Sequence, residues 1–144
     1  MNAKNIVVAT DFSTHAAAAL DCAVQLAKSL DATLTIVHVE LAPVLTAPYD
    51  DEDDPSGMQA HHLLEQINPG DPRVNLQRVL LRGSVAEGLL KFTAERHADL
   101  IIMGTHGQTN SPAAVLGTVA EEVTKKATCI VVAVRPASSG NPSR

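Results

Sequence analysis

Glycine and threonine residues in the second half of the chain have the chemistry that a phosphate-binding site needs, although they match neither of the two common phosphate-binding fingerprints. Nine residues separate Gly107 from the pair Gly117 and Thr118, and Gly104 precedes Gly107 in the same segment. Glycines here predict positive-φ turns in which backbone amides approach a ligand closely. A helix that starts at Gly117 and Thr118 presents unpaired amides, and its dipole favours an anion. The Thr118 hydroxyl can accept a cap bond from the Glu121 amide and donate to a phosphate oxygen. Together these groups could form a phosphate cradle, but for the glycines alone simple turn formation is the favoured interpretation.

A second polar segment, Thr10 and Asp11, follows a short apolar run that ends at Ala9. In an open α/β sheet, ligands bind beyond the carboxyl ends of the strands, where the strand order reverses. Thr10 and Asp11 therefore join the candidate site, and Asp11 could help to hold Mg²⁺ through water. His106, within the glycine segment, either contacts phosphate or shapes the turn, and both hypotheses stay open.

Neither three further histidines nor the two cysteines are predicted to form a metal site. His38 lies inside an apolar run, which favours a hydrogen-bonded core histidine over a ligand. His61 and His62 are adjacent, so on a helix they point about 100° apart and form no i, i+4 metal pair. Cys22 and Cys129 match no C-x-x-C or zinc spacing. Both are expected to pack in the core, with redox reactivity of Cys129 as an alternative.

Short apolar runs alternate with amphipathic stretches, and this alternation predicts the elements that position the site. Five runs are predicted as strands: Asn5–Ala9, Thr33–Val39, Leu76–Leu81, Leu100–Met103 and Ile130–Val134. Four helices are predicted between them, starting at Ser13 or Thr14, near Ala60, at Ser84 and at Thr118. The last two carry the capping-box pattern Ser/Thr-x-x-Glu. This order predicts an α/β fold, with a parallel sheet covered by helices on both faces.

Length and composition exclude several classes of protein. The 144 residues predict one domain over 1–136, with an acidic, proline-rich loop at 41–57 and a disordered tail at 137–144. The net charge of −5 and the three aromatic residues argue against nucleic acid as a partner. No apolar run is long enough for membrane insertion or a signal peptide, so a cytoplasmic protein is expected.

The glycine pattern resembles a motif of the universal stress protein family. Gly104-x2-Gly107-x9-Gly117-Thr118 is similar to the nucleotide-binding motif G-x2-G-x9-G-[ST] of the ATP-binding branch of that family. Further stretches are similar to strands and turns of the family: Ile6–Ser13, Leu34–Val39 and Ala98–Gly107. The resemblance runs from Lys4 to Arg135, with two departures. Ile130 stands where many members have proline, and Ala9 also replaces a proline of the family.

The resemblance implies a Rossmann-like five-stranded parallel sheet of order 3-2-1-4-5 with about four helices, and it implies bound ATP, with ADP and AMP left open. The implied contacts are Ala9, Thr10 and Asp11 on the adenosine side, Val39 against adenine, Met103 and Gly104 near the base and ribose, and Gly107, Gly117, Thr118 and Val119 at the phosphates. It also implies a homodimer. The last predicted strand, Ile130–Val134, lacks the charges and prolines that protect a sheet edge, so it is the expected contact.

Three functions stay open at this point. Between Ile101 and Lys125 the chain has no basic residue except His106, whereas fast phosphoryl transfer needs Arg or Lys at the transferred group. This favours an ATP-binding regulatory or stress-response protein that hydrolyses ATP slowly at most. The alternative is a non-catalytic homodimeric scaffold with a vestigial pocket, which regulates a partner such as a transporter or an enzyme. A true phosphotransferase or hydrolase would turn over faster than about 1 s⁻¹.

Overall fold

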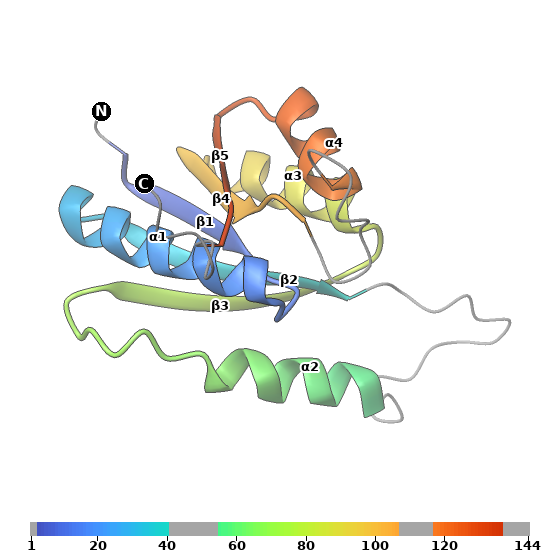
Figure 1. Ribbon diagram of the computed structural model, residues 1–144, viewed down its shortest axis with the longest axis horizontal. Coiled ribbons are helices and arrows are strands. Elements are labelled where there is room, and N and C mark those ends of the chain that lie inside the picture. The colour runs from blue at the N-terminus through green and yellow to red at the C-terminus, as the bar shows by residue number, and fades with distance from the viewer. Residues whose placement is uncertain (1–2, 41–54, 107–116, 137–144) are drawn as a thin grey trace, which may run out of the picture.

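The computed structural model describes residues 3–40, 55–106 and 117–136, in which strands and helices alternate (Figure 1). The strands are β1 (Asn5–Ala9), β2 (Thr33–Glu40), β3 (Asn75–Arg82), β4 (Leu100–Gly104) and β5 (Ile130–Val134). The helices are α1 (Thr14–Leu30), α2 (Pro55–Gln66), α3 (Val85–Glu95) and α4 (Thr118–Lys126). The predicted α/β fold class is confirmed, and each predicted strand is found within one residue of its expected ends.

The strands form one parallel sheet of order β3-β2-β1-β4-β5, which confirms the expected order. The central strand, β1, pairs with β2 on one side and with β4 on the other. Ile6, Val7 and Val8 of β1 are at most 2% exposed, because helices cover both faces of the sheet. Burial of such side chains on both faces explains why the central strands are nearly continuous apolar runs.

Two apolar layers hold the helices against the sheet (Figure 1). α1 and α2 pack on one face, over alternate strand residues such as Ile6, Leu34 and Ile102. α3 and α4 pack on the other face, where Val7 and Ile101 lie among the buried residues. Since successive side chains of a strand point to opposite faces, each strand contributes to both layers.

The residues at the starts of α1 and α2 are of types that favour a helix N-terminus. Ser13 caps α1, and its hydroxyl accepts a hydrogen bond from the Ala16 amide at 3.2 Å. α2 begins at Pro55, five residues before Ala60 and inside the predicted loop 41–57. Proline suits a first helical position because its missing N–H needs no partner there. The rest of that predicted loop, 41–54, and the predicted tail, 137–144, lie outside the described residues.

The two capping boxes do not form as predicted. Ser84 is the N-cap of α3, but its side chain makes no cap hydrogen bond. The N-cap of α4 is Gly117 rather than Thr118, and the Glu121 amide donates to the Gly117 carbonyl at 2.9 Å. The first intrahelical bond therefore closes one residue earlier than expected. Thr118 becomes the first helical residue, and its hydroxyl is not the cap.

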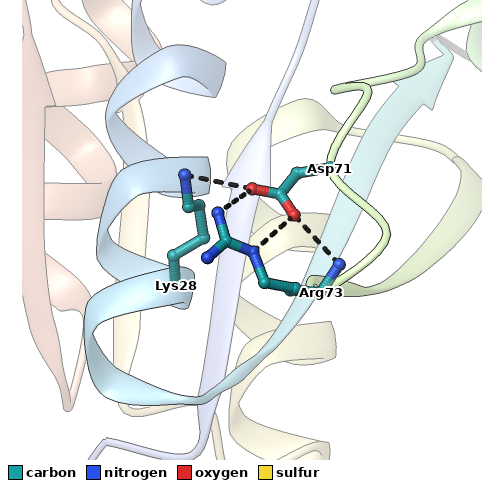
Figure 2. Close-up of polar contacts among 3 residues, drawn as sticks. All are labelled: Lys28, Asp71 and Arg73. Atoms are coloured by element: carbon teal, nitrogen blue, oxygen red, sulfur yellow. Dashed lines mark hydrogen bonds and ion pairs between the residues drawn. The ribbon is translucent and has the colours of Figure 1, made fainter.

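A cluster of three charged residues ties the end of α1 to the connection between α2 and β3 (Figure 2). Lys28 Nζ lies 3.0 Å from Asp71 Oδ2, and the Arg73 guanidinium bridges both Asp71 oxygens at 3.0 and 3.1 Å. The Arg73 amide adds a 3.0 Å bond to Asp71 Oδ1. Hydrogen bonds from Arg73 and then Lys28 hold the pKa of Asp71 well below its usual range.

The lowered pKa of Asp71 predicts a pH-dependent contribution to stability. A carboxyl whose pKa falls on folding stabilises the protein above its unfolded pKa, about 3.9, and loses this effect as the pH falls through the folded value. We therefore expect Asp71→Asn to lower the urea midpoint at pH 7, and the difference from the unchanged protein to shrink by pH 3. The measurement is unfolding by circular dichroism at both pH values. Asp21→Asn, at an exposed position of α1, is the control, and a difference of equal size at both pH values would contradict the prediction.

Candidate functional site

A cavity of about 560 Å³ lies at the carboxyl ends of β1, β2 and β4. Residues from the starts of α1, α3 and α4 and from the middle of α2 complete its walls. The strand order reverses between β1 and β4, which is where open α/β sheets bind ligands. Its volume lies within the range of small-molecule sites, about 300–1,000 Å³.

Most of the predicted site residues line this one cavity. They are Ala9, Thr10, Asp11, Val39, Met103, Gly104, His106, Thr118 and Val119. Gly117 is not among the lining residues, and Gly107 lies outside the described part of the chain. The fold thus brings together the polar segment after β1 and the start of α4, which are far apart in the sequence.

Short polar contacts shape the turn between β1 and α1. The Thr10 amide extends the sheet by donating to the Val37 carbonyl at 2.9 Å. The Thr10 hydroxyl accepts from the Phe12 amide at 3.0 Å, and Asp11 Oδ1 accepts from the Ser13 amide at 2.9 Å. Phe12 has a φ of 65°, a left-handed conformation that is uncommon for a large side chain. These bonds hold the turn against the cavity.

Backbone hydrogen bonds place the start of α4. The Gly117 amide donates to the Thr105 carbonyl at 2.7 Å, and the Thr105 amide donates to the Val134 carbonyl at 3.0 Å. The Gly117 amide was predicted to bind phosphate, but its N–H already donates to the Thr105 carbonyl within the protein. The amides of Thr118, Val119 and the next residue precede the first intrahelical bond, so they have no partner within the helix. This first turn lines the cavity.

Position 104 requires glycine for its packing and not for the predicted positive φ. Its φ is not positive, since the positive-φ glycines among the described residues are Gly70 and Gly83. A Cβ on Gly104 would lie 2.8 Å from the Cβ of His15 and 3.0 Å from its carbonyl carbon. Close packing of α1 against the end of β4 therefore requires glycine at this position.

Two histidines on different elements meet beside Thr105. His106 Nδ1 lies 3.0 Å from the Thr105 hydroxyl, which also lies 3.4 Å from Nδ1 of His15. The two imidazole rings are 5.4 Å apart, edge to face. His106 both contacts the turn and lines the cavity, so neither hypothesis for it is removed.

Two residues near the end of β2 extend the cavity beyond the predicted set. His38 is hydrogen-bonded as predicted, with Nδ1 2.8 Å from the Thr10 carbonyl oxygen, but it also lines the cavity. Glu40 lines it too and was not predicted. Its position, directly after Val39 at the carboxyl end of a strand, is the signal that identified Asp11. α2 contributes Gln59, Ala60 and Leu63, which depend on how that helix docks and have no local sequence signal.

In the described part of the chain, the cysteines are not placed for redox chemistry, and no cluster of metal ligands is found. Cys22 and Cys129 are free and half-buried. Burial, and then the Asp99 carboxylate, raise the pKa of the Cys129 thiol, which disfavours the reactive thiolate. Among the described residues, no group of three or more potential ligands is placed to hold a metal ion. The described helices are also too short or too polar to cross a membrane.

Comparison with known sequences identifies the family. The sequence model of the universal stress protein family matches residues 2–135. The chain belongs to the universal stress protein family. A universal stress protein of Methanocaldococcus jannaschii is 30% identical over 140 residues, which cover 92% of this chain and 82% of the relative. The universal stress protein YxiE of Bacillus subtilis is 28% identical over 146 residues, covering 92% and 99%.

Solved universal stress proteins share the fold. UspA from Lactobacillus plantarum superposes with a TM-score of 0.76 at 23% identity, covering 94% of this chain and 99% of the other. A universal stress protein in complex with cAMP gives 0.74 at 21% identity, with 95% and 100% covered. The universal stress protein from Archaeoglobus fulgidus in complex with dAMP gives 0.65 at 24%, with 93% and 99% covered.

The contact between Gly104 and His15 predicts that a single methyl group disturbs the fold. Gly104→Ala should destabilise the protein by about 1–3 kcal/mol, the cost of overpacking a filled core. Gly88→Ala, in α3, is the matched control because its Cβ would make an ordinary 3.5 Å contact with Val39. The control should leave stability unchanged or raise it, since alanine favours helix. Urea unfolding measures both variants, and a Gly104→Ala protein as stable as the unchanged one would refute the packing argument.

Proposed function

We propose that this universal stress protein binds an adenine nucleotide, with ATP as the preferred ligand, and acts as a regulatory stress-response protein. The observation that carries the proposal is the single cavity that joins the first turn of α4 to the polar turn after β1. A triphosphate needs donors at one end of its site, and a purine needs apolar surfaces at the other. The described walls offer both.

The phosphate end of the proposed site is the first turn of α4. A helix N-terminus attracts anions through unpaired amides and the positive end of its dipole. Thr118 is exposed at this turn, where its hydroxyl can donate to a phosphate oxygen. Mg²⁺ would accompany the triphosphate, and Asp11, which lines the cavity, could hold it through water. Thr118 is also the last residue of the pattern that resembles the ATP-binding branch of the family.

The base end of the proposed site is apolar. Ala9, Val39 and Met103 line the cavity there, and the last two are at most 8% exposed. Two solved proteins of the same fold are described as complexes with cAMP and with dAMP, which are both adenine nucleotides. These complexes support an adenine base here, while ATP rather than a monophosphate rests on the glycine pattern and the start of α4.

Binding is favoured over fast catalysis because the described lining of the cavity contains no Lys or Arg. Rapid phosphoryl transfer uses such a residue to stabilise charge on the transferred group, together with a positioned base and metal. Under this proposal the protein hydrolyses ATP slowly at most. A state with bound nucleotide could then persist long enough for a partner protein to recognise it.

A homodimer through β5 is part of the proposal. β5 pairs with β4 and lies at the edge of the sheet, and Ile130 at its start is 49% exposed. An apolar strand without protecting charges is a template for pairing with a second copy. A scaffold function, in which this dimer regulates a partner and the cavity stays empty, is the second candidate.

The nucleotide proposal predicts a ligand and a dependence on Thr118. Mass spectrometry of the purified protein should identify an adenine nucleotide, and calorimetry should show ATP binding. Thr118→Ala should weaken ATP binding about tenfold, because a hydrogen bond to a charged group is lost, while adenosine affinity stays within about twofold. Thr124→Ala is the control, since that hydroxyl donates to the Ala120 carbonyl within α4. A protein that binds no nucleotide would favour the scaffold.

The edge-strand proposal predicts that a charge on β5 separates the subunits. Ile130→Lys places an ammonium group on the exposed edge, and we expect sedimentation velocity to show a shift from dimer to monomer at micromolar concentration. Met58→Lys is the control, because Met58 is a comparable hydrophobic residue, 66% exposed on α2. An unchanged dimer in the β5 variant would place the interface elsewhere.

A further inference from the structure

A buried hydroxyl group connects two histidine rings that come from distant parts of the sequence. His106 Nδ1 lies 3.0 Å from Thr105 Oγ1, and Nδ1 of His15, on α1, lies 3.4 Å from the same atom. Thr105 is 6% exposed, and the two rings stand edge to face with their centroids 5.4 Å apart. Because both rings meet one hydroxyl proton, the protonation of one ring depends on the other.

The Thr105 hydroxyl requires the two neutral rings to carry their protons on different nitrogens. A hydroxyl donates one proton and accepts through two lone pairs. When it donates to Nδ1 of one ring, Nδ1 of the other ring makes its bond by donating, so the neutral rings are opposite tautomers. The donating ring has an unprotonated Nε2, which can take a second proton without breaking either hydrogen bond. One positive charge fits this arrangement, and a second is disfavoured by repulsion between rings 5.4 Å apart.

His106 is the member of the pair that lies at the proposed phosphate end. It lines the cavity, whereas His15 is not among the described lining residues. It also follows Thr105, whose carbonyl accepts the amide of Gly117, the N-cap of α4. Its contact with the hydroxyl is the shorter of the two, and hydrogen bonds from charged donors are short. The positive charge of the pair is therefore expected on His106.

A proton on His106 adds a cationic side chain to a phosphate end that otherwise has none in the described lining. That lining contains no Lys or Arg, and its other histidine, His38, belongs to β2, on the far side of β1 from β4. Without the proton, the described phosphate end consists of neutral donors and the positive end of the α4 dipole. Protonation of His106 therefore strengthens the attraction for phosphate.

Fixed charges of both signs surround the pair. The Asp11 carboxylate lines the same cavity and favours a charged His106. Exposed Arg135, which directly follows the residue bonded to the Thr105 amide, opposes that charge. The other charged groups on the neighbouring elements are Glu121 and Glu122 of α4, which pair with Lys125 and Lys126, and Glu40 at the end of β2. The sequence 107–116 contains no titratable residue. A bound phosphate would shift this balance toward the charged ring.

We propose that His106 is a proton-dependent phosphate contact, and that Thr105 and His15 position it by setting the tautomer through which it takes up the proton. The inference rests on the proposed nucleotide function and concerns the regulation of that site. Since phosphate favours the imidazolium, ATP binding takes up a proton, and by reciprocity a fall in pH tightens ATP binding. Histidines change charge between about pH 5 and 8, so nucleotide occupancy responds to acidification within this range.

Calorimetry at one Mg²⁺ concentration tests the proton linkage. The unchanged protein should gain about tenfold more ATP affinity between pH 8 and pH 6 than His106→Gln does, the effect of one hydrogen bond to a charged group. The titration of ATP itself is common to both proteins, so the difference belongs to His106. At pH 7, buffers of different ionisation enthalpy should reveal proton uptake with ATP but not with adenosine, which has no phosphate. His61→Gln, 62% exposed on α2, is the matched control and should behave like the unchanged protein.

Nitrogen NMR of the imidazole rings tests the roles of Thr105 and His15 in the unchanged protein. At pH 8.5 the two rings should be opposite tautomers, with signals assigned from the spectra of His15→Gln and His106→Gln. With saturating ATP at pH 6.5, His106 should be protonated on both nitrogens while His15 stays neutral. Two identical tautomers, or a charge on His15 instead, would overturn the shared-hydroxyl argument.

The remaining outcomes separate this inference from the proposed function. ATP binding without proton uptake, or with equal uptake for adenosine, would overturn the role of His106 and leave nucleotide binding intact. The same conclusion follows if His106→Gln keeps the full pH dependence while its circular dichroism spectrum and melting temperature match those of the unchanged protein. If the unchanged protein binds neither ATP nor adenosine between pH 6 and pH 8, the proposed function fails, and the inference fails with it.

Discussion

The chain leaves β1 and β4 toward opposite sides of the sheet, and the candidate site depends on this divergence. After β1 the chain turns at Phe12 into α1 and returns as β2, whereas β4 is followed by α4 and β5. β1 and β4 are themselves joined in register, from Ile6 with Leu100 to Val8 with Ile102. Burial of such side chains contributes about 1.5–3 kcal/mol each, so the paired strands form a firm base. A crevice at their carboxyl ends then follows from the topology.

Backbone hydrogen bonds make this crevice a preorganised site. The Thr105 carbonyl accepts a hydrogen bond from the Gly117 amide, and the Thr105 amide donates to the Val134 carbonyl of β5. The start of α4 is therefore linked to the ends of β4 and β5. On the other wall, the Thr10 amide and carbonyl reach Val37 and His38 of β2. Donors and acceptors are therefore placed by the main chain before any ligand arrives. Sites of this kind lose less entropy on binding than sites built from free side chains.

Sequence reasoning identified the parts of this fold that depend on local periodicity. The strands were predictable because burial on both faces demands continuous apolar runs, and the sheet order followed from the family resemblance. The N-cap of α4 was misplaced by one residue because Gly117 and Thr118 are both acceptable caps. The packing requirement for glycine at position 104 was not predictable, because His15, which contacts it, lies far away in the sequence, on α1. Glu40 carries the same local signal as Asp11, a carboxylate at the carboxyl end of an apolar strand.

Because of the contact between Gly104 and His15, the first glycine of the motif is weak evidence for ligand binding. Every residue except glycine has a Cβ, and a Cβ at position 104 would meet the backbone and Cβ of His15. A chain of this fold that binds no ligand would still be restricted to glycine there, because the helix would still lie against the strand. The first glycine of the motif is thus a signature of architecture. Evidence of retained binding has to be sought in Thr118, which selection for folding alone would release.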